Sequence, residues 1–239
     1  MHRSIKKDGM DTKYYQPWSE TPDDFELWNS ESPYRWIFNK LELALRCKHI
    51  AGPVPVLPPL DGYYIVRPIY NLFGMSILAT KVWLNTYDNP VIMDNMHPGS
   101  FWCEWFGGNH YSVDFEWNKG WRPMFTTRGF NSDDQIWRWT KWIKVDYPDI
   151  KLPTFLDELR DNQILNIEFR GNHIVEVHLR LGNMNGDWNG LWDQNEIVPI
   201  WEDRLEEKDL LLNSGYKYIE RPEDTGGRKE ISRVGFCYR

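Results

Sequence analysis

Two carboxylates and an imidazole come together in the most regular hairpin pattern of the sequence. Residues 164–169 and 173–179 predict two strands joined by a short Arg-Gly-Asn turn. Glu176 and His178 are two residues apart on the second strand, so they project from one face. Glu168 on the first strand can lie beside them. Because two adjacent carboxylates repel unless a cation lies between them, this spacing is typical of a magnesium site beside a nucleotide phosphate.

Arg180 continues the same face of the second strand. A guanidinium at this position can bind a phosphate or a carboxylate. A solvent-exposed strand surface with scattered charges explains the same four residues. The hairpin alone therefore leaves both interpretations open.

The rest of the chain mixes helices with strands, which predicts an α+β fold. Helices are expected where apolar residues recur at helical spacing without glycine or proline, and strands where aromatic and β-branched residues gather between turns. The expected helices are 34–49, 133–145 and 154–162, and the expected strands outside the hairpin are 63–67, 76–84, 100–106, 111–117, 121–127 and 197–201.

Composition limits the classes of protein. The chain has 239 residues and a formal net charge of -7, which argues against a protein that grips nucleic acid. No apolar run approaches the roughly 20 residues that span a bilayer, and the basic N-terminus has no apolar core behind it. Three widely spaced cysteines show no metal-ligand spacing. We therefore expect a cytoplasmic protein without a membrane segment.

Four segments, taken in order, resemble the ATP-grasp family. Residues 38–55 resemble its entry segment, in which a lysine opens a helix that ends in a Gly-x-Pro-x-Pro-like turn. Residues 64–68 (Tyr-Ile-Val-Arg-Pro) resemble the central strand, usually Val-x-Lys-Pro, and residues 102–113 resemble the adenine linker and the strand after it. Residues 176–180 (Glu-Val-His-Leu-Arg) resemble the terminal Glu-Val-Asn-x-Arg segment. The order of the four motifs over residues 36–182 carries the resemblance, which implies two α+β lobes whose antiparallel sheets grip a nucleotide.

The resemblance implies a role for each residue around ATP. Lys40 and Arg67 would contact the α- and β-phosphates. The backbone groups of three consecutive residues would read the adenine edge, and His110 stands where the family has a ribose-binding glutamate. The three adenine-linker residues are Glu104, Trp105 and Phe106.

The resemblance also implies a metal site and a catalytic arginine. Glu168, Glu176 and His178 would hold Mg²⁺, and Arg180, with Arg67, would stabilise the transferring phosphoryl group or an acyl-phosphate. His178 replaces the usual asparagine, and because magnesium prefers oxygen ligands, Mn²⁺ is an alternative. The phosphate-covering loop, residues 69–76, has one glycine where the family has several.

The expected domain organisation has three parts. Residues 1–34 form an irregular N-terminal arm, residues 35–182 the ATP-grasp-like region and residues 183–239 a C-terminal extension packed on the same domain. Members of the family place a separate α/β domain before the lysine helix, which we expect to be missing. The acceptor platform would then come from the acidic tail, from a second subunit of a homo-oligomer, or from a peptide or protein acceptor.

The leading functional hypothesis is an ADP-forming ligase that joins a carboxylate to an amine. The alternative is a divergent nucleotide-binding module that recognises a partner through a tryptophan-rich surface, with base stacking as one use of its indoles. A kinase-like use of the fold is a third option. The tryptophans considered for stacking are Trp102, Trp105, Trp117 and Trp121.

Overall fold

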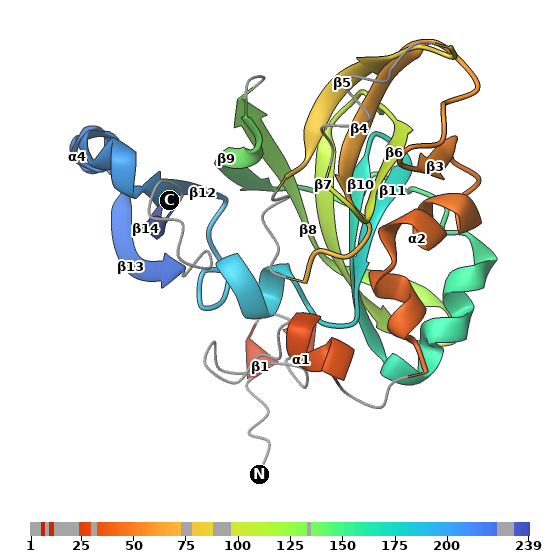
Figure 1. The fold of residues 1–239 in the computed structure, drawn as a ribbon. Helices are drawn as coiled ribbons and strands as arrows, with labels where there is room; N and C mark the ends of the chain where they lie inside the picture. Colours follow the sequence, from red (N-terminus) through yellow and green to blue (C-terminus); the bar gives the residue numbers. More distant parts are fainter. Residues whose placement is uncertain are drawn as a thin grey trace.

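An eight-stranded antiparallel sheet forms the centre of the protein (Figure 1). The computed structural model describes residues 6–7, 10–11, 24–29, 33–72, 78–87, 97–132, 135–223 and 232–239. The strands of the large sheet lie in the order β11 (His173–His178), β10 (Ile164–Arg170), β7 (His110–Trp117), β8 (Trp121–Ser132), β9 (Gln135–Lys144), β12 (Glu196–Trp201), β14 (Arg233–Tyr238) and β13 (Lys217–Glu223).

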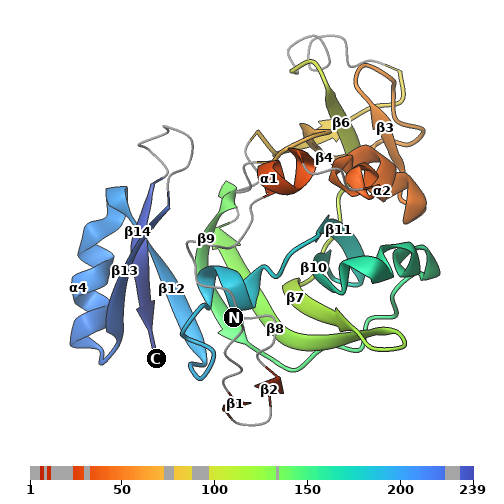
Figure 2. The same ribbon diagram turned by 90° about the horizontal axis from the view of Figure 1, so that it is seen from below.

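A second antiparallel sheet of four strands stands over one end of the large sheet (Figure 2). Its order is β3 (Ala51–Pro53), β6 (Ser100–Glu104), β4 (Gly62–Pro68) and β5 (Thr80–Leu84). Strand β4 confirms the expected strand 63–67. In the expected strand 76–84, β5 begins at Thr80, residues 78 and 79 precede it, and residues 76 and 77 lie outside the described residues. Half of the expected phosphate-covering loop, residues 73–76, lies outside the described residues.

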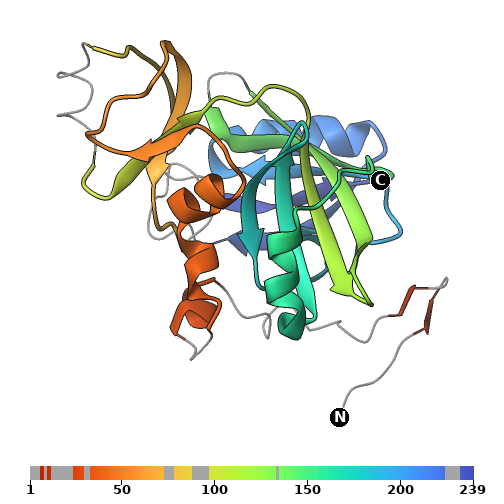
Figure 3. The same ribbon diagram turned by 90° about the vertical axis from the view of Figure 1, so that its right-hand side faces the viewer.

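Helices cover one face of the large sheet, on the side of β10 and β11 (Figure 3). They pack against a buried cluster that includes Leu165, Ile167 and Phe169 of β10. The remaining helical and short elements are β1 (Lys6–Lys7), β2 (Met10–Asp11), α1 (Asp24–Asn29), η3 (Arg35–Phe38), α2 (Lys40–Arg46), η4 (Thr154–Asn162), η5 (Asn183–Asp187), η6 (Glu202–Arg204) and α4 (Leu205–Asn213). None of the described helices is both long and apolar enough to cross a membrane.

The helix expected over residues 34–49 is wrong in its extent. The chain forms the 3₁₀ turn η3, becomes extended at Asn39 and then starts α2 at Lys40. The Asn39 side chain accepts a hydrogen bond from the Glu42 amide at 3.0 Å. Asn39 is therefore the N-cap of α2, and it follows the last residue of η3. This break in the helix determines the position from which the Lys40 side chain projects.

The helix expected over residues 133–145 is wrong in kind. Residues 135–144 form β9, which pairs with β8 through a register shift at Phe130 and Asn131. The shift lets Trp139 and Trp142, three residues apart, both pack on Gly129, where an added Cβ would lie 2.7 Å from each ring. A β-bulge thus produced the spacing that imitates a helix.

The segments on either side of the ATP-grasp-like region hold more regular structure than expected. The arm 1–34, expected to be irregular, includes the helix α1. In the tail, the expected strand 197–201 is confirmed as β12, but α4, β13 and β14 were not foreseen. Strand β12 joins the sheet through only two residue pairs with β9, Glu196 with Ile143 and Ile197 with Trp142.

A buried carboxylate that the sequence did not single out anchors the chain after β11. Asp114 of β7 is fully buried and accepts hydrogen bonds from the amides of Gly182, Asn183 and Met184 at 2.8, 3.2 and 2.7 Å, and from Asn166 Nδ2 at 2.8 Å. Burial raises the pKa of Asp114, and these four donors offset part of that shift. The segment that follows Arg180 is therefore held on the sheet.

Candidate functional site

A pocket of about 750 Å³, partly open to solvent, lies between the two sheets. Eight of the ten predicted site residues line it, and the other two, His178 and Arg180, do not. The eight are Lys40, Arg67, Glu104, Trp105, Phe106, His110, Glu168 and Glu176.

Lys40 and Glu176 form a buried ion pair across the pocket. Lys40 is 5% exposed and is placed by the start of α2, where its amide donates to the Ile69 carbonyl at 2.9 Å. Its Nζ contacts Oε1 of Glu176. Arg67 Nη1 lies 3.9 Å from the other oxygen of the same carboxylate. The two positive groups expected to bind phosphate therefore neutralise Glu176 in this structure.

Arg67 also ties the two sheets together. Its Nη2 donates to the carbonyl of Val175 at 2.7 Å. Val175 is the extra residue of a β-bulge, because Glu168 pairs with Glu176 while Phe169 pairs with Ile174. A bulged residue is left outside the ladder, so its carbonyl is available to Arg67. No spacing in the sequence revealed this contact.

Glu168 and Glu176 face each other directly in the strand register, as the hairpin pattern predicted. Nε2 of His110 lies 3.2 Å from Oε2 of Glu168. Burial would raise the pKa of Glu168, but the neighbouring His110 and the positive charges of His178 and Lys40 lower it to about 2. Glu168 is therefore an ionised carboxylate on the pocket wall.

His178 and Arg180 are held by a residue of the N-terminal segment. Nδ1 of His178 donates to Oδ2 of Asp24 at 2.7 Å, and Nε of Arg180 donates to Oδ1 at 3.1 Å. Burial would lower the pKa of His178, but the charge and hydrogen bond of Asp24 raise it above its usual value. Nε2 of His178 is 3.7 Å from Oε1 of Glu176. Nothing in the sequence linked Asp24 to these two residues, which lie more than 150 positions later.

The fit to a divalent cation rests on two carboxylates. In the part of the chain that the structure describes, no three His, Cys, Asp or Glu side chains are grouped so as to hold a metal ion. The charge and hydrogen bond of Asp24 raise the pKa of His178, which favours the protonated ring, a form with no lone pair for a metal. Glu168 and Glu176 still fit magnesium, which is commonly held by one or two carboxylates together with substrate phosphates and water.

The expected adenine linker connects β6 to β7 at the edge of the pocket. The amides of Glu104 and Trp105 already donate to the carbonyls of Ile50 and Tyr63, at 2.9 and 3.0 Å, so these two N–H groups are not available to a base. Phe106 stacks on His173 with ring centroids 4.0 Å apart and planes at 6°.

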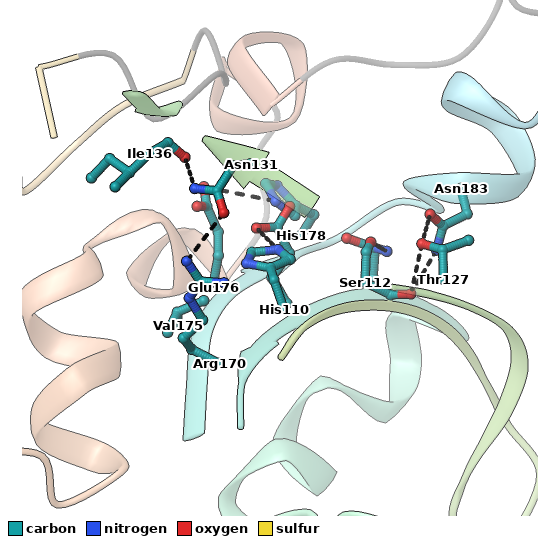
Figure 4. Close-up of polar contacts among 12 residues, drawn as sticks. His110, Ser112, Thr127, Asn131, Ile136, Arg170, Val175, Glu176, His178 and Asn183 are labelled. Atoms are coloured by element: carbon teal, nitrogen blue, oxygen red, sulfur yellow. Dashed lines mark hydrogen bonds and ion pairs between the residues drawn. The ribbon is translucent and has the colours of Figure 1, made fainter. Parts of the chain in front are cut away.

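Strand β9 supplies pocket residues that sequence reasoning missed. Ile136 and Trp139 line the pocket, and the Trp139 ring lies 4.5 Å from that of His110. Figure 4 shows Asn131 beside Ile136 and Arg170, with Asn131 donating to Ile136 at 3.0 Å and Arg170 donating to Asn131 at 3.4 Å. The incorrect helix over 133–145 concealed this wall of the pocket.

Tryptophan stacking on a nucleic acid receives little support from the positions of the indoles. Trp102 is buried against Tyr64, and Trp121 donates its Nε1–H to the Leu156 carbonyl at 3.0 Å. Trp117 packs edge-on against Trp121 at 5.2 Å. Trp105 lines the pocket, with Lys81 Nζ 4.6 Å from its ring.

The sequence matches no protein-family model, and no curated protein matches it either. Solved structures do match the fold. An L-amino acid ligase from Bacillus licheniformis superimposes with a TM-score of 0.54 at 11% identity, covering 85% of this chain and 66% of its own. A carboxyaminoimidazole ribonucleotide synthase from Aspergillus clavatus, complexed with ATP, gives 0.53 at 10% identity, covering 85% and 68%.

A third structure, N5-carboxyaminoimidazole ribonucleotide synthetase from Thermus thermophilus, gives a TM-score of 0.51 at 9% identity over 85% and 68% of the two chains. The chain has the ATP-grasp fold. The predicted α+β class with antiparallel sheets is thereby confirmed. The chain spans about two thirds of the length of these structures.

Proposed function

We propose that this chain binds ATP in the pocket between its two sheets and uses it to join a carboxylate to an amine. The observation that supports the proposal is the gathering of eight predicted site residues, from six different segments, around one pocket. Two of the structures with this fold are ligases or synthases of small molecules by name, and one of them holds ATP.

The proposed phosphate subsite consists of Lys40 and Arg67. Both side chains are ion-paired with Glu176 in this structure. When ATP binds, its phosphate oxygens would take the place of the Glu176 carboxylate beside these two cations. Nε of Arg67 is buried and has no hydrogen-bond partner among the described residues, which leaves it a donor for a ligand.

The exchange would also release Glu176 from Lys40. Glu168 and Glu176 would then hold a magnesium ion, which would neutralise part of the negative charge of the phosphates. Adenine would lie beside Phe106 and Trp105 at the linker. The ribose would lie near His110.

The proposed chemistry has two transfers. A carboxylate oxygen of the first substrate attacks the γ-phosphorus, the bond from that phosphorus to the β–γ bridging oxygen breaks, and ADP leaves. The nitrogen of an amine then attacks the acyl carbon, the bond from that carbon to the phosphate oxygen breaks, and phosphate leaves as the amine loses a proton. Arg67 and Arg180 would stabilise negative charge on the transferring groups.

The proposal is tested by coupling ADP release to pairs of acceptors. A panel of carboxylic acids, amines and short peptides should contain a pair for which ADP appears only when the acid is present. Hydroxylamine in place of the amine should trap the activated acid as a hydroxamate. Glu176→Gln should abolish turnover without unfolding the chain. ADP release that never depends on an acid would refute a ligase.

A binding module with the same fold is the second candidate. It is favoured by the pairing of His178 and Arg180 with Asp24 and by the lack of a three-residue metal group in the described part of the chain. ATP binding without ADP release across the whole panel would support this candidate.

A further inference from the structure

The N-terminal segment places one carboxylate against two residues of the candidate site. Asp24 is the first residue of α1 and is only 3% exposed. Its Oδ1 accepts from Nε of Arg180, and its Oδ2 accepts from His178 and, at 3.4 Å, from Nη2 of Arg180. His178 and Arg180 are separated by one residue, so a single carboxylate bridges both.

The bridge determines which part of the Arg180 guanidinium remains for a ligand. Nε and Nη2 lie 3.1 and 3.4 Å from the oxygens of Asp24. Nη1 makes no hydrogen bond or ion pair with any described residue, and the Arg180 side chain is 24% exposed. A guanidinium fixed along one edge presents the other edge in a defined direction.

The same bridge orients the imidazole of His178. With Nδ1 held by Asp24, the opposite nitrogen Nε2 is directed to the Glu176 side, 3.7 Å from Oε1. Glu176 is the carboxylate that Lys40 and Arg67 contact. Asp24 therefore connects, through one ring, to the proposed phosphate and metal subsites.

Helix α1 packs on the elements that present Lys40. The ring of Trp28 lies 6.1 Å from Phe38 of η3 and 5.1 Å from Tyr70, edge-on in both cases. The Tyr70 hydroxyl accepts a hydrogen bond from Asn39, the N-cap of α2, at 3.2 Å. Asp24 is thus held in place by contacts beyond its own ion pairs.

We infer that Asp24 is a positioning residue of the proposed reaction, in which it fixes the orientation of Arg180 and holds the ring of His178 beside Glu176, which lines the pocket. The inference rests on the proposed function and adds the N-terminal segment to its site. Without Asp24, the guanidinium of Arg180 and the imidazole of His178 would lose the carboxylate that bridges them and would no longer have a fixed orientation.

The test compares Asp24→Asn with Asp24→Glu and with the matched control Glu26→Gln, which removes an exposed carboxylate from the same helix. Steady-state turnover is measured with Mg²⁺–ATP and the acid–amine pair found by the acceptor panel. We expect Asp24→Asn to lower kcat about 10- to 100-fold, the usual effect of losing a partner that orients a site residue. The KM for ATP should stay unchanged, because Asp24 does not line the pocket.

Two further readouts separate positioning from stability. Asp24→Glu restores a carboxylate and should recover part of the lost kcat, while Glu26→Gln should match the unaltered chain. The ¹⁵N shift of His178 Nδ1, measured at one pH, should change in Asp24→Asn and not in Glu26→Gln. If Asp24→Asn does not fold, the kcat of Asp24→Glu and its ¹⁵N shift decide alone.

The outcomes distinguish this inference from the proposed function. Unchanged kcat in Asp24→Asn overturns the inference and leaves the ligase intact. Increased kcat would mean that Asp24 blocks the site, and an equal change in kcat and KM would mean a structural role, so both overturn it. A chain that never releases ADP overturns the proposed function itself, even if the ¹⁵N shift verifies the contact between Asp24 and His178.

Discussion

Replacement of Asp114 by asparagine tests whether the buried anchor under the site holds the chain as the structure indicates. Oδ1 of Asp114 accepts from Asn166, Gly182 and Asn183, and Oδ2 accepts from Met184. Asparagine keeps one oxygen but directs an NH₂ group at one set of donors. At least one buried N–H then faces another donor.

The size of the effect follows from these contacts. Losing one charge-assisted hydrogen bond costs about 1.5–3 kcal/mol, and leaving a buried amide unsatisfied costs about 1–3 kcal/mol more. Asparagine also removes the cost of burying a charge, which is the cause that raises the pKa of Asp114. We therefore expect a net loss of about 2–4 kcal/mol in the free energy of unfolding. This corresponds to a melting temperature lower by roughly 4–16 °C for a chain of this length.

The assay is urea unfolding followed by tryptophan fluorescence and circular dichroism. Asp146→Asn is the matched control, since it makes the same substitution at an exposed carboxylate. We expect the control to change stability by no more than about 0.5 kcal/mol. If Asp114→Asn is as stable as the control, the carboxylate does not anchor the segment after β11 and the reasoning is refuted.

Two other substitutions probe the pocket walls. Gly129→Ala should destabilise the fold by about 1–3 kcal/mol, because its Cβ would lie 2.7 Å from both Trp139 and Trp142; thermal unfolding checks this against Gly107→Ala, where a Cβ meets nothing within 4 Å. Burial lowers the pKa of His49 to about 4, so the folded chain binds a proton at His49 more weakly than the unfolded chain does. The stability that comes from keeping His49 neutral is therefore fully present above pH about 6.5 and is lost as the pH falls toward 4. After discounting for partial exposure, His49→Gln should reduce the change in the free energy of unfolding between pH 4.5 and 7 by about 1–2 kcal/mol. If the unaltered chain and His49→Gln show the same pH dependence of unfolding in this range, the assignment is contradicted.

The sequence predicted the parts of the site that depend on local pattern. Strand periodicity and a short turn were enough to pair Glu168 with Glu176, and the register agrees. The same pattern shows that Glu176 and His178 leave one face of the strand. The resemblance to the ATP-grasp family then brought Lys40 and Arg67 to the same pocket.

The parts that were missed depend on contacts distant in sequence or on irregular backbone. The bulge at Val175 provides a carbonyl for Arg67, and no residue type marks such a position. The bulge in β9 gave Trp139 and Trp142 a helical spacing. Asp24 lies in a segment broken by prolines, where a partner more than 150 residues away leaves no periodic signal.

The roles of the site residues around ATP stay predictions. The strand register and the pocket determine where these side chains lie. Which ligand each of them contacts is a matter for binding and turnover experiments. The same holds for the metal ion, the acceptors and the cytoplasmic setting. The ATP-grasp fold with its two antiparallel sheets is the part that the structural comparisons confirm.

The most direct measurement of the central claim is a calorimetric titration of the chain with Mg²⁺–ATP. We expect one ATP per chain and an affinity about 10- to 100-fold weaker in Lys40→Met, as for the loss of one charge-assisted contact to phosphate. Lys151→Met, which removes an exposed lysine outside the pocket, should bind like the unaltered chain. Absence of ATP binding, or equal affinity in Lys40→Met and Lys151→Met, would contradict a nucleotide site between the two sheets.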